Sequence, residues 1–267
     1  MIPLPHDVGL LLIGHGTRSE QGTRQFLQLG DQFARRIAPT PLESAFLELQ
    51  QPSIAEAIQR LVAKKIERLI VMPLLLFAAG HAKRDIPQAV KLALESCCRT
   101  ELPWTQTAPL GLHPSILELS RRRMAESPLS QDAEDGESGC LLIVGRGSPD
   151  QSATADMQEF AKRRQQQEGM DTAVAFLAMA QPLLQEQLQQ LVAANYQFVI
   201  VQPHLLFAGE LVDSLRQHVV RMARAHPKTE WLVTPLLADA LGEVGVGTEL
   251  LLEAMVDRCT EAVAAWR

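Results

Sequence analysis

The sequence predicts an α/β protein of two tandem, duplicated domains, each a small parallel β-sheet of about four strands flanked by helices. Three segments repeat in the same order: 11–17 as 142–148, 45–52 as 175–182, and 73–78 as 203–208. The offset of about 130 residues is far longer than a solenoid repeat, so each copy is expected to be a complete domain. We expect a binding cleft between the two domains.

Short apolar runs predict the strands of the first copy. The runs at 8–13 and 69–72 are followed by glycine or proline, as is typical of buried parallel strands. Further strands are expected near 43–47 and 104–107. Right-handed crossovers between parallel strands would place the carboxyl ends of all four at one edge of the sheet.

Helices are expected to alternate with these strands: at 26–37, from Ser53, after Asp85, and at about 114–124. The start at Ser53 is supported by its capping-box spacing to Glu56 and by an apolar stripe of helical period over 54–62. His113 directly precedes the last of these helices, and we expect it to cap that helix rather than to take part in chemistry.

Composition limits the classes of protein and of partner. The chain has 267 residues, of which 46% are hydrophobic, enough to bury two cores of moderate size. A formal net charge of −6 provides no basic surplus for phosphate groups, so we expect no nucleic-acid partner. The N-terminus lacks a signal-peptide pattern and no apolar run approaches a membrane span, so we expect a cytoplasmic protein without a membrane partner.

The repeat also predicts the domain boundaries. An N-terminal domain is expected at 1–124 and a C-terminal domain at 139–267. The segment 125–138 between them has five acidic residues, no basic residue and one leucine, and is expected to be an acidic linker. The four cysteines have no CxxC spacing and lie in apolar runs, which predicts buried free thiols.

Three side chains that can bind a metal ion follow three successive strands of the first copy: His15, Glu48 and His81. Each alone has an ordinary explanation, such as a hydrogen-bonded turn or a solvated strand end. The second copy has different residues at the matching positions: Arg146, Ala178 and Glu210. Because fold requirements would act on both copies alike, we expect the first set to be functional. Two imidazoles and a carboxylate suit a divalent ion such as cobalt, iron, nickel or zinc.

The motifs around these residues carry a resemblance to a known family. They are GHGTR at 14–18, FLE at 46–48 with PS at 52–53, and PLLL at 73–76 followed by GH at 80–81 and DIP at 85–87. Together they resemble the sirohydrochlorin chelatases over nearly the whole chain. The length and the duplication resemble, more narrowly, the long two-domain form of the cobalamin-pathway sirohydrochlorin cobaltochelatases.

This resemblance implies a lyase that inserts cobalt, or alternatively iron, into sirohydrochlorin without nucleotide hydrolysis, in cobalamin or siroheme biosynthesis. The metal ion would be a substrate, with no tightly bound cofactor. His15 and His81 would be the metal-binding and proton-accepting pair, and Glu48 would help to hold the ion. The chain departs from the commonest pattern at Thr17, in place of serine, and at Ala82, in place of a second histidine. It also lacks the histidine-rich tail of some relatives.

Sirohydrochlorin carries many carboxylates, so a site for it needs cations. Four basic residues adjoin the motifs and are expected to contact the substrate: Arg18, Lys83, Arg84 and Arg146. His204 lies in an apolar run, where it could be a core histidine or a residue that contacts substrate or metal. Both alternatives stay open from the sequence.

Two rival functions use the same residues. A non-enzymatic carrier of tetrapyrrole or metal would bind without turnover. A phosphohistidine-type phosphatase is disfavoured because its turn requires arginine before the histidine, where this chain has Gly14. Since the duplication already supplies two half-sites, we expect a monomer or a weak oligomer.

Overall fold

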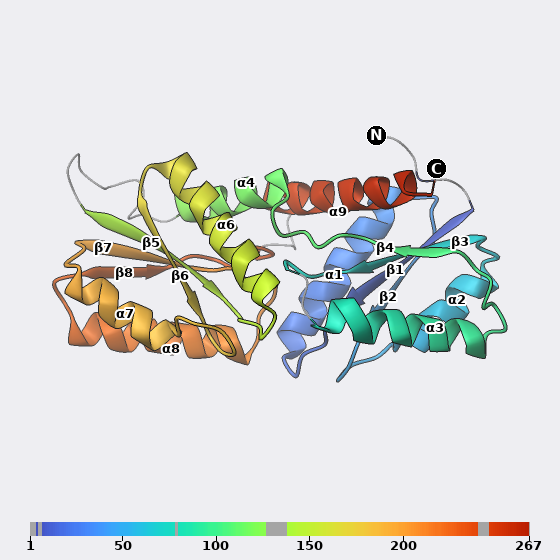
Figure 1. Ribbon diagram of the computed structural model, residues 1–267, viewed down its shortest axis with the longest axis horizontal. Coiled ribbons are helices and arrows are strands. Elements are labelled where there is room, and N and C mark those ends of the chain that lie inside the picture. The colour runs from blue at the N-terminus through green and yellow to red at the C-terminus, as the bar shows by residue number, and fades with distance from the viewer. Residues whose placement is uncertain (1–3, 5–6, 78–79, 127–137, 240–245, 267) are drawn as a thin grey trace. The chain divides into compact units, whose positions relative to one another are not determined.

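The computed structural model describes residue 4 and residues 7–77, 80–126, 138–239 and 246–266, with the side chains of His81, Ala82 and Val246 excluded. It contains two four-stranded parallel sheets with helices on both faces (Figure 1). This confirms the predicted fold class. No helix in the described ranges is long and apolar enough to cross a membrane.

The first sheet has the strand order β2-β1-β3-β4. Its strands are β1 (Val8–Gly14), β2 (Leu42–Phe46), β3 (Arg68–Pro73) and β4 (Trp104–Gln106). Its helical elements are α1 (Glu20–Ile37), α2 (Ile54–Ala63), the π-helical turn η1 (His81–Asp85) and α3 (Ile86–Ser96). Every residue of β1 is buried between its two parallel neighbours, which explains its continuous apolar sequence.

The second sheet repeats this plan in the order β6-β5-β7-β8. Its strands are β5 (Gly139–Gly145), β6 (Asp171–Phe176), β7 (Phe198–Pro203) and β8 (Glu230–Val233). The remaining helices are α4 (Pro114–Ala125), α6 (Gln151–Glu168), α7 (Leu184–Ala193), α8 (Glu210–Ala225) and α9 (Val246–Ala264).

The compact units do not follow the predicted boundaries at 124 and 139. They exchange the final helices of the two repeats: α4 belongs to the second unit, 111–240, and α9 belongs to the first, with 1–110. The physical reason is packing, since α4 contacts α6 and β7 whereas α9 contacts α1 and β3 (Figure 1). Most of the predicted linker lies outside the described residues.

Helix starts follow the predicted local chemistry. Ser53 and Glu56 form the capping box of α2, with Glu56 N donating to Ser53 Oγ at 3.3 Å and Ser53 N donating to Glu56 Oε2 at 2.7 Å. His113 caps α4, because its Nδ1 accepts a hydrogen bond from Ser115 N at 3.2 Å. Both predictions are confirmed.

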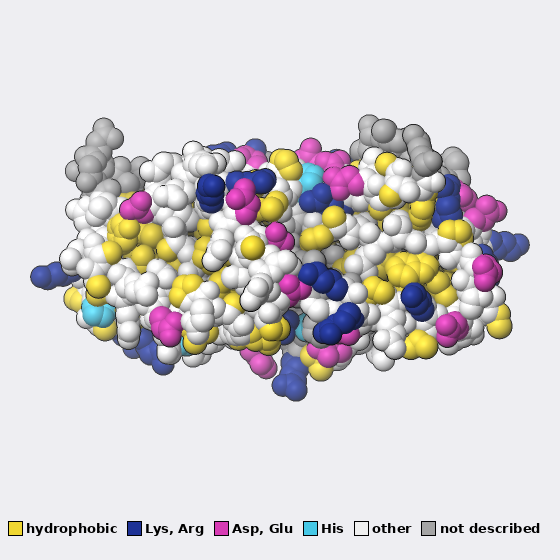
Figure 2. Space-filling view, in the orientation of Figure 1, with side chains coloured by type: hydrophobic (Ala, Val, Ile, Leu, Met, Phe, Trp, Pro, Cys, Tyr) yellow, Lys and Arg dark blue, Asp and Glu magenta, His cyan; other side chains and the backbone are white. Residues whose placement is uncertain are grey.

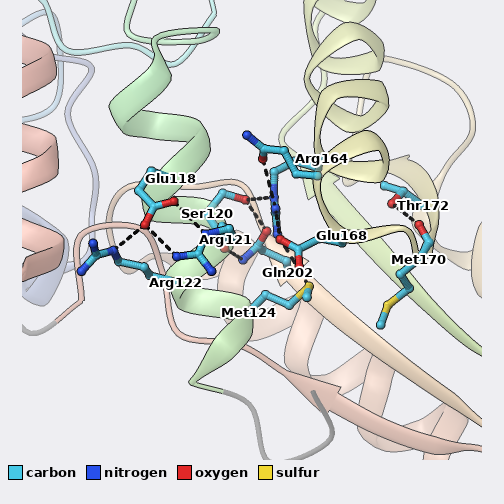
Figure 3. A network of polar contacts seen from close by, with 11 residues as sticks. Glu118, Ser120, Arg121, Arg122, Met124, Arg164, Glu168, Met170, Thr172 and Gln202 are labelled. Atoms are coloured by element: carbon cyan, nitrogen blue, oxygen red, sulfur yellow. Dashed lines mark hydrogen bonds and ion pairs between the residues drawn. The ribbon is translucent and has the colours of Figure 1, made fainter. Parts of the chain in front are cut away.

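The core of the second unit contains a polar network (Figure 3). The side chain of Arg164 is fully buried, and its Nε donates to Ser120 Oγ of α4 at 3.0 Å while Nη1 pairs with Glu168. Ser120 Oγ in turn donates to Gln202 Oε1 at 2.6 Å, and Gln202 Nε2 donates to Ser120 O at 2.8 Å. The first unit has Phe33 at the position that matches Arg164, and Phe33 is fully buried.

The cysteine prediction is wrong in part. Cys140 and Cys259 are buried, Cys97 is half-buried, and Cys98 is exposed. Burial raises the pKa of the Cys140 thiol to about 12. Cys98 differs because it lies in the turn after α3, with a φ of 51°, where the backbone leaves the helix.

Candidate functional site

The first candidate residues meet at the carboxyl end of the first sheet. His15 follows β1 and Glu48 follows β2, and backbone hydrogen bonds continue past the ends of both strands, with Leu47 N donating to Gly14 O at 2.9 Å and Glu48 N donating to His15 O at 3.1 Å. This places His15 Nε2 3.2 Å from Glu48 Oε1. The two side chains are 23% and 50% exposed, so the pair is open to a ligand.

A glycine turn allows the segment after β1 to lie this close to the segment after β2. Gly16 has a φ of 98°, and a Cβ at this position would lie 1.9 Å from the carbonyl oxygen of Glu48. Gly147 has a φ of 90° in the second copy, where a Cβ would lie 1.7 Å from the carbonyl oxygen of Ala178. No residue other than glycine fits either contact, because both the backbone conformation and the space exclude a side chain.

The His15–Glu48 pair can do two kinds of chemistry. An imidazole and a carboxylate are both ligands for borderline divalent ions. A neutral imidazole can also accept a proton near neutral pH, and a carboxylate beside it can fix its orientation. The exposed edge therefore offers exchangeable metal ligands and a base within one pair of side chains.

The third predicted ligand is placed only by its backbone. His81 is the first residue of η1, the helical turn that follows β3, and its side chain lies outside the described set. Among the side chains that are described, no three His, Cys, Asp or Glu groups form a metal-ligand cluster. The part of His81 in the ligand set stays a prediction.

The predicted cations are exposed. Arg18 lies in the loop between β1 and α1, and Lys83 and Arg84 lie on η1. Arg146 follows β5 in the second unit, where its carbonyl oxygen accepts a hydrogen bond from Ala178 N at 2.9 Å. Lys and Arg side chains are interspersed with Asp and Glu on the face drawn in Figure 2.

His204 is a core residue in this structure. It is 2% exposed, and its ring lies against that of Phe160 with a centroid distance of 4.3 Å. Burial, with the nearby charge of Arg164, lowers the pKa of His204 to about 3. A substrate contact needs an accessible atom, so of the two alternatives left by the sequence the structure favours the core histidine.

One feature of this edge was missed in the sequence. Leu49, next to Glu48, and Met179, next to Ala178, both have positive φ, 65° and 59°, and both are exposed. Their shared place in the repeat was visible, but neither leucine nor methionine predicts a left-handed turn, which glycine or asparagine usually occupies. Gln50 Nε2 also donates to Thr17 O at 2.8 Å and so joins this turn to the glycine turn.

Comparison with known proteins identifies the family. The CbiX family model matches residues 9–127 and 140–262, one match for each copy. The chain belongs to the CbiX family. This match confirms the family resemblance that the sequence motifs carry.

Two relatives agree with this assignment, and one solved structure shows the same fold. A sirohydrochlorin ferrochelatase of Priestia megaterium is 27% identical over 215 residues, which cover 80% of this chain and 79% of the relative. A sirohydrochlorin cobaltochelatase of the same organism is 27% identical over 227 residues, which cover 83% and 72%. SirB from Bacillus subtilis with Fe3+ matches this CbiX protein with a TM-score of 0.78 at 23% identity, over 94% of this chain and 95% of that chain, and has the same fold.

Proposed function

We propose that this CbiX protein is a sirohydrochlorin chelatase, a lyase that inserts cobalt or iron into sirohydrochlorin in cobalamin or siroheme biosynthesis. The observation that carries the proposal is the exposed His15–Glu48 pair, with its 3.2 Å contact, at the carboxyl edge of the first sheet. The names of the relatives support the reaction class, because both a ferrochelatase and a cobaltochelatase are among them. We place the enzyme in the cytoplasm, as a monomer or weak oligomer.

The chemistry follows from what metal insertion requires. As a divalent ion enters the macrocycle, it exchanges its ligands for pyrrole nitrogens, and two pyrrole N–H protons leave. Glu48 and His15 would hold the hydrated ion through weak, exchangeable bonds, with His81 as the second imidazole. One histidine would accept a pyrrole proton, and both protons would pass finally to solvent. No nucleotide and no resident cofactor enter this scheme.

Exposed cations would bind the carboxylates of the substrate. Arg18, Lys83 and Arg84 support this role in the first unit, because they are exposed on the segments that follow β1 and β3. Arg146 would do the same in the second unit, where it replaces His15 at the glycine turn. Arginine suits this purpose because its guanidinium can bind a carboxylate through two parallel hydrogen bonds. His204 is left out of the proposed substrate contacts because it is buried.

The test is an anaerobic absorbance assay with sirohydrochlorin and, separately, Co2+ or Fe2+. Multiple turnovers above the uncatalysed rate are expected, and the two rates would rank the metals. The His15→Ala, His81→Ala double variant should lose insertion while keeping the melting temperature of the parent. Tight stoichiometric binding of an unchanged ring would replace the chelatase by a carrier.

A further inference from the structure

The two units share an exposed apolar side chain at the same turn. Leu49 and Met179 are 58% and 62% exposed, the highest fractions among the large hydrophobic side chains in the described ranges. Gln50 N donates to Glu48 O at 2.8 Å across Leu49, and Ala180 N donates to Ala178 O at 2.8 Å across Met179. With positive φ, each is the central residue of the γ-turn form that is rare and strained.

Folding does not account for these side chains. Glycine or asparagine would form the same turn with less strain, and an exposed leucine or methionine gains no burial that offsets it. Lys65 and Asn195 also have positive φ, but they lie just past the ends of α2 and α7, where a left-handed residue is an ordinary helix terminus. Strained apolar residues at a sheet edge point instead to a function for the side chain.

Comparison of the two copies limits what the function of these side chains can be. The metal-capable residues beside the turn are present in the first copy and absent from the second, whereas the apolar side chain is present in both. The turn therefore serves something other than metal binding. Each apolar side chain adjoins polar groups of the glycine turn: Leu49 follows Glu48 beside His15, and Met179 follows Ala178 beside the exposed Arg146.

We propose that Leu49 and Met179 are contacts for the flat apolar face of the macrocycle, each at the sheet edge of its own unit. This inference rests on the proposed function, since it takes a tetrapyrrole as the ligand. A tetrapyrrole has an apolar π-face and a rim of carboxylates, which matches an apolar side chain with arginine or lysine nearby. The thioether of methionine also makes favourable contacts with aromatic rings.

The experiment measures the Kd of metal-free sirohydrochlorin by absorbance titration, together with kcat and KM for insertion. Leu49→Gly and Met179→Gly are the informative variants, because glycine tolerates the turn while removing the side chain. Each should raise Kd and KM about five- to tenfold, with little change in kcat and an equal or higher melting temperature. Leu49→Met and Met179→Leu, which keep an apolar side chain, should bind nearly as the parent does.

Leu92→Ala is the matched control, because Leu92 is 55% exposed on α3 and is not part of either turn. It should leave Kd unchanged. Parental Kd and KM in both glycine variants would overturn the inference even if the parent inserts metal, and loss in one variant alone would overturn the assignment of the other residue. If the parent binds the ring without turnover and the glycine variants bind it more weakly, the inference is supported and the chelatase function is refuted.

A parent that does not bind the ring would refute both proposals. The same samples should be measured by sedimentation velocity. If the glycine variants alter self-association while ring binding is unchanged, the turns contact a second copy of the chain and the inference is overturned.

Discussion

The carboxyl edges of the two sheets have the same backbone and different chemistry. Glu48 N donates to His15 O at 3.1 Å in the first unit, and Ala178 N donates to Arg146 O at 2.9 Å in the second. The glycine turn produces this contact in both. The first edge presents an imidazole and a carboxylate, whereas the second presents a guanidinium. Duplication has thus kept the backbone that displays two side chains and left the side chains free to diverge.

The cores differ in the same manner. Phe33 and Met72 are buried in the first unit at positions that Arg164 and Gln202 occupy in the second. A buried guanidinium is tolerated only with hydrogen-bond partners, and Ser120 of α4 supplies one of them. The apolar version is covered by α9, which has buried apolar residues such as Leu251 and Met255. Core polarity therefore matches each final helix to the unit on which it packs.

The largest expected effect is the loss of metal insertion when the first sheet edge is altered. His15→Ala should lower kcat/KM for metal insertion by about 10²- to 10⁴-fold, because it removes a proposed metal ligand and base. Metal-free sirohydrochlorin should still bind, as measured by absorbance titration. His218→Ala, at a partly exposed position on α8, is the control and should retain parental turnover. Parental activity of His15→Ala would place the chemistry elsewhere.

Removing the charge from the polar core should have the next largest effect. Arg164→Ala should lower the free energy of unfolding by about 3–5 kcal/mol, because it leaves a cavity in the core, removes the donor to the buried Ser120 Oγ and removes the ion-pair partner of the half-buried Glu168. Urea unfolding monitored by circular dichroism would measure the change.

A matched variant tests the comparison between the cores. The triple variant Arg164→Phe, Gln202→Met, Ser120→Ala imitates the apolar core and should recover much of the lost stability. If it were less stable than Arg164→Ala, the two cores would not be interchangeable in the way that their positions suggest.

Substitutions in the two glycine turns should lower stability equally and activity unequally. Gly16→Ala and Gly147→Ala should each cost about 2–3 kcal/mol of unfolding free energy, because φ is positive and a Cβ would overlap a carbonyl oxygen. Only Gly16→Ala displaces the His15–Glu48 pair, so only this variant should lower kcat strongly. Gly169→Ala, which has a positive φ but open space, is the control for backbone strain alone. Equal losses of kcat in both turns would contradict the asymmetry.

The smallest expected effect is a pH dependence of the second core. The pKa of His204 is about 3 in the folded state, below the ordinary value of 6.5. The unfolded chain therefore binds more protons between these values, and stability decreases as pH falls below about 6.5. At pH 5 the lowered pKa of His204 reduces the free energy of unfolding by about 2 kcal/mol relative to pH 8.

His204→Leu, which introduces the residue found at Leu74 of the first unit, should remove this reduction. The difference in unfolding free energy between pH 8 and pH 5 should then be smaller than in the parent by about 2 kcal/mol. Urea unfolding at both pH values, with His218→Leu as a control, would measure it. If His204→Leu had the same pH dependence as the parent, His204 would be protonated as easily in the folded protein as in the unfolded chain.

Much of the site was predictable because one copy serves as a control for the other. His15 and Glu48 were selected by their absence from the second copy and by their place after two strands, and the structure brings their side chains into contact. His204 could not be resolved in this way, because an apolar run predicts burial of its neighbours and not of the imidazole itself. The predicted cleft between the domains stays a prediction.

The sequence by itself determined the duplicated parallel sheets, the start of α2 at Ser53 and the edge at which His15 and Glu48 lie, because apolar periodicity, caps and glycine turns act over a few residues. Tertiary structure decided the exchange of α4 and α9, the burial of His204 and the exposed left-handed turns at Leu49 and Met179. The helix exchange and the burial of His204 depend on packing between segments far apart in the chain, where the free energy of burial outweighs local preference. The two turns have a backbone conformation that leucine and methionine disfavour, so the residue types there do not predict it.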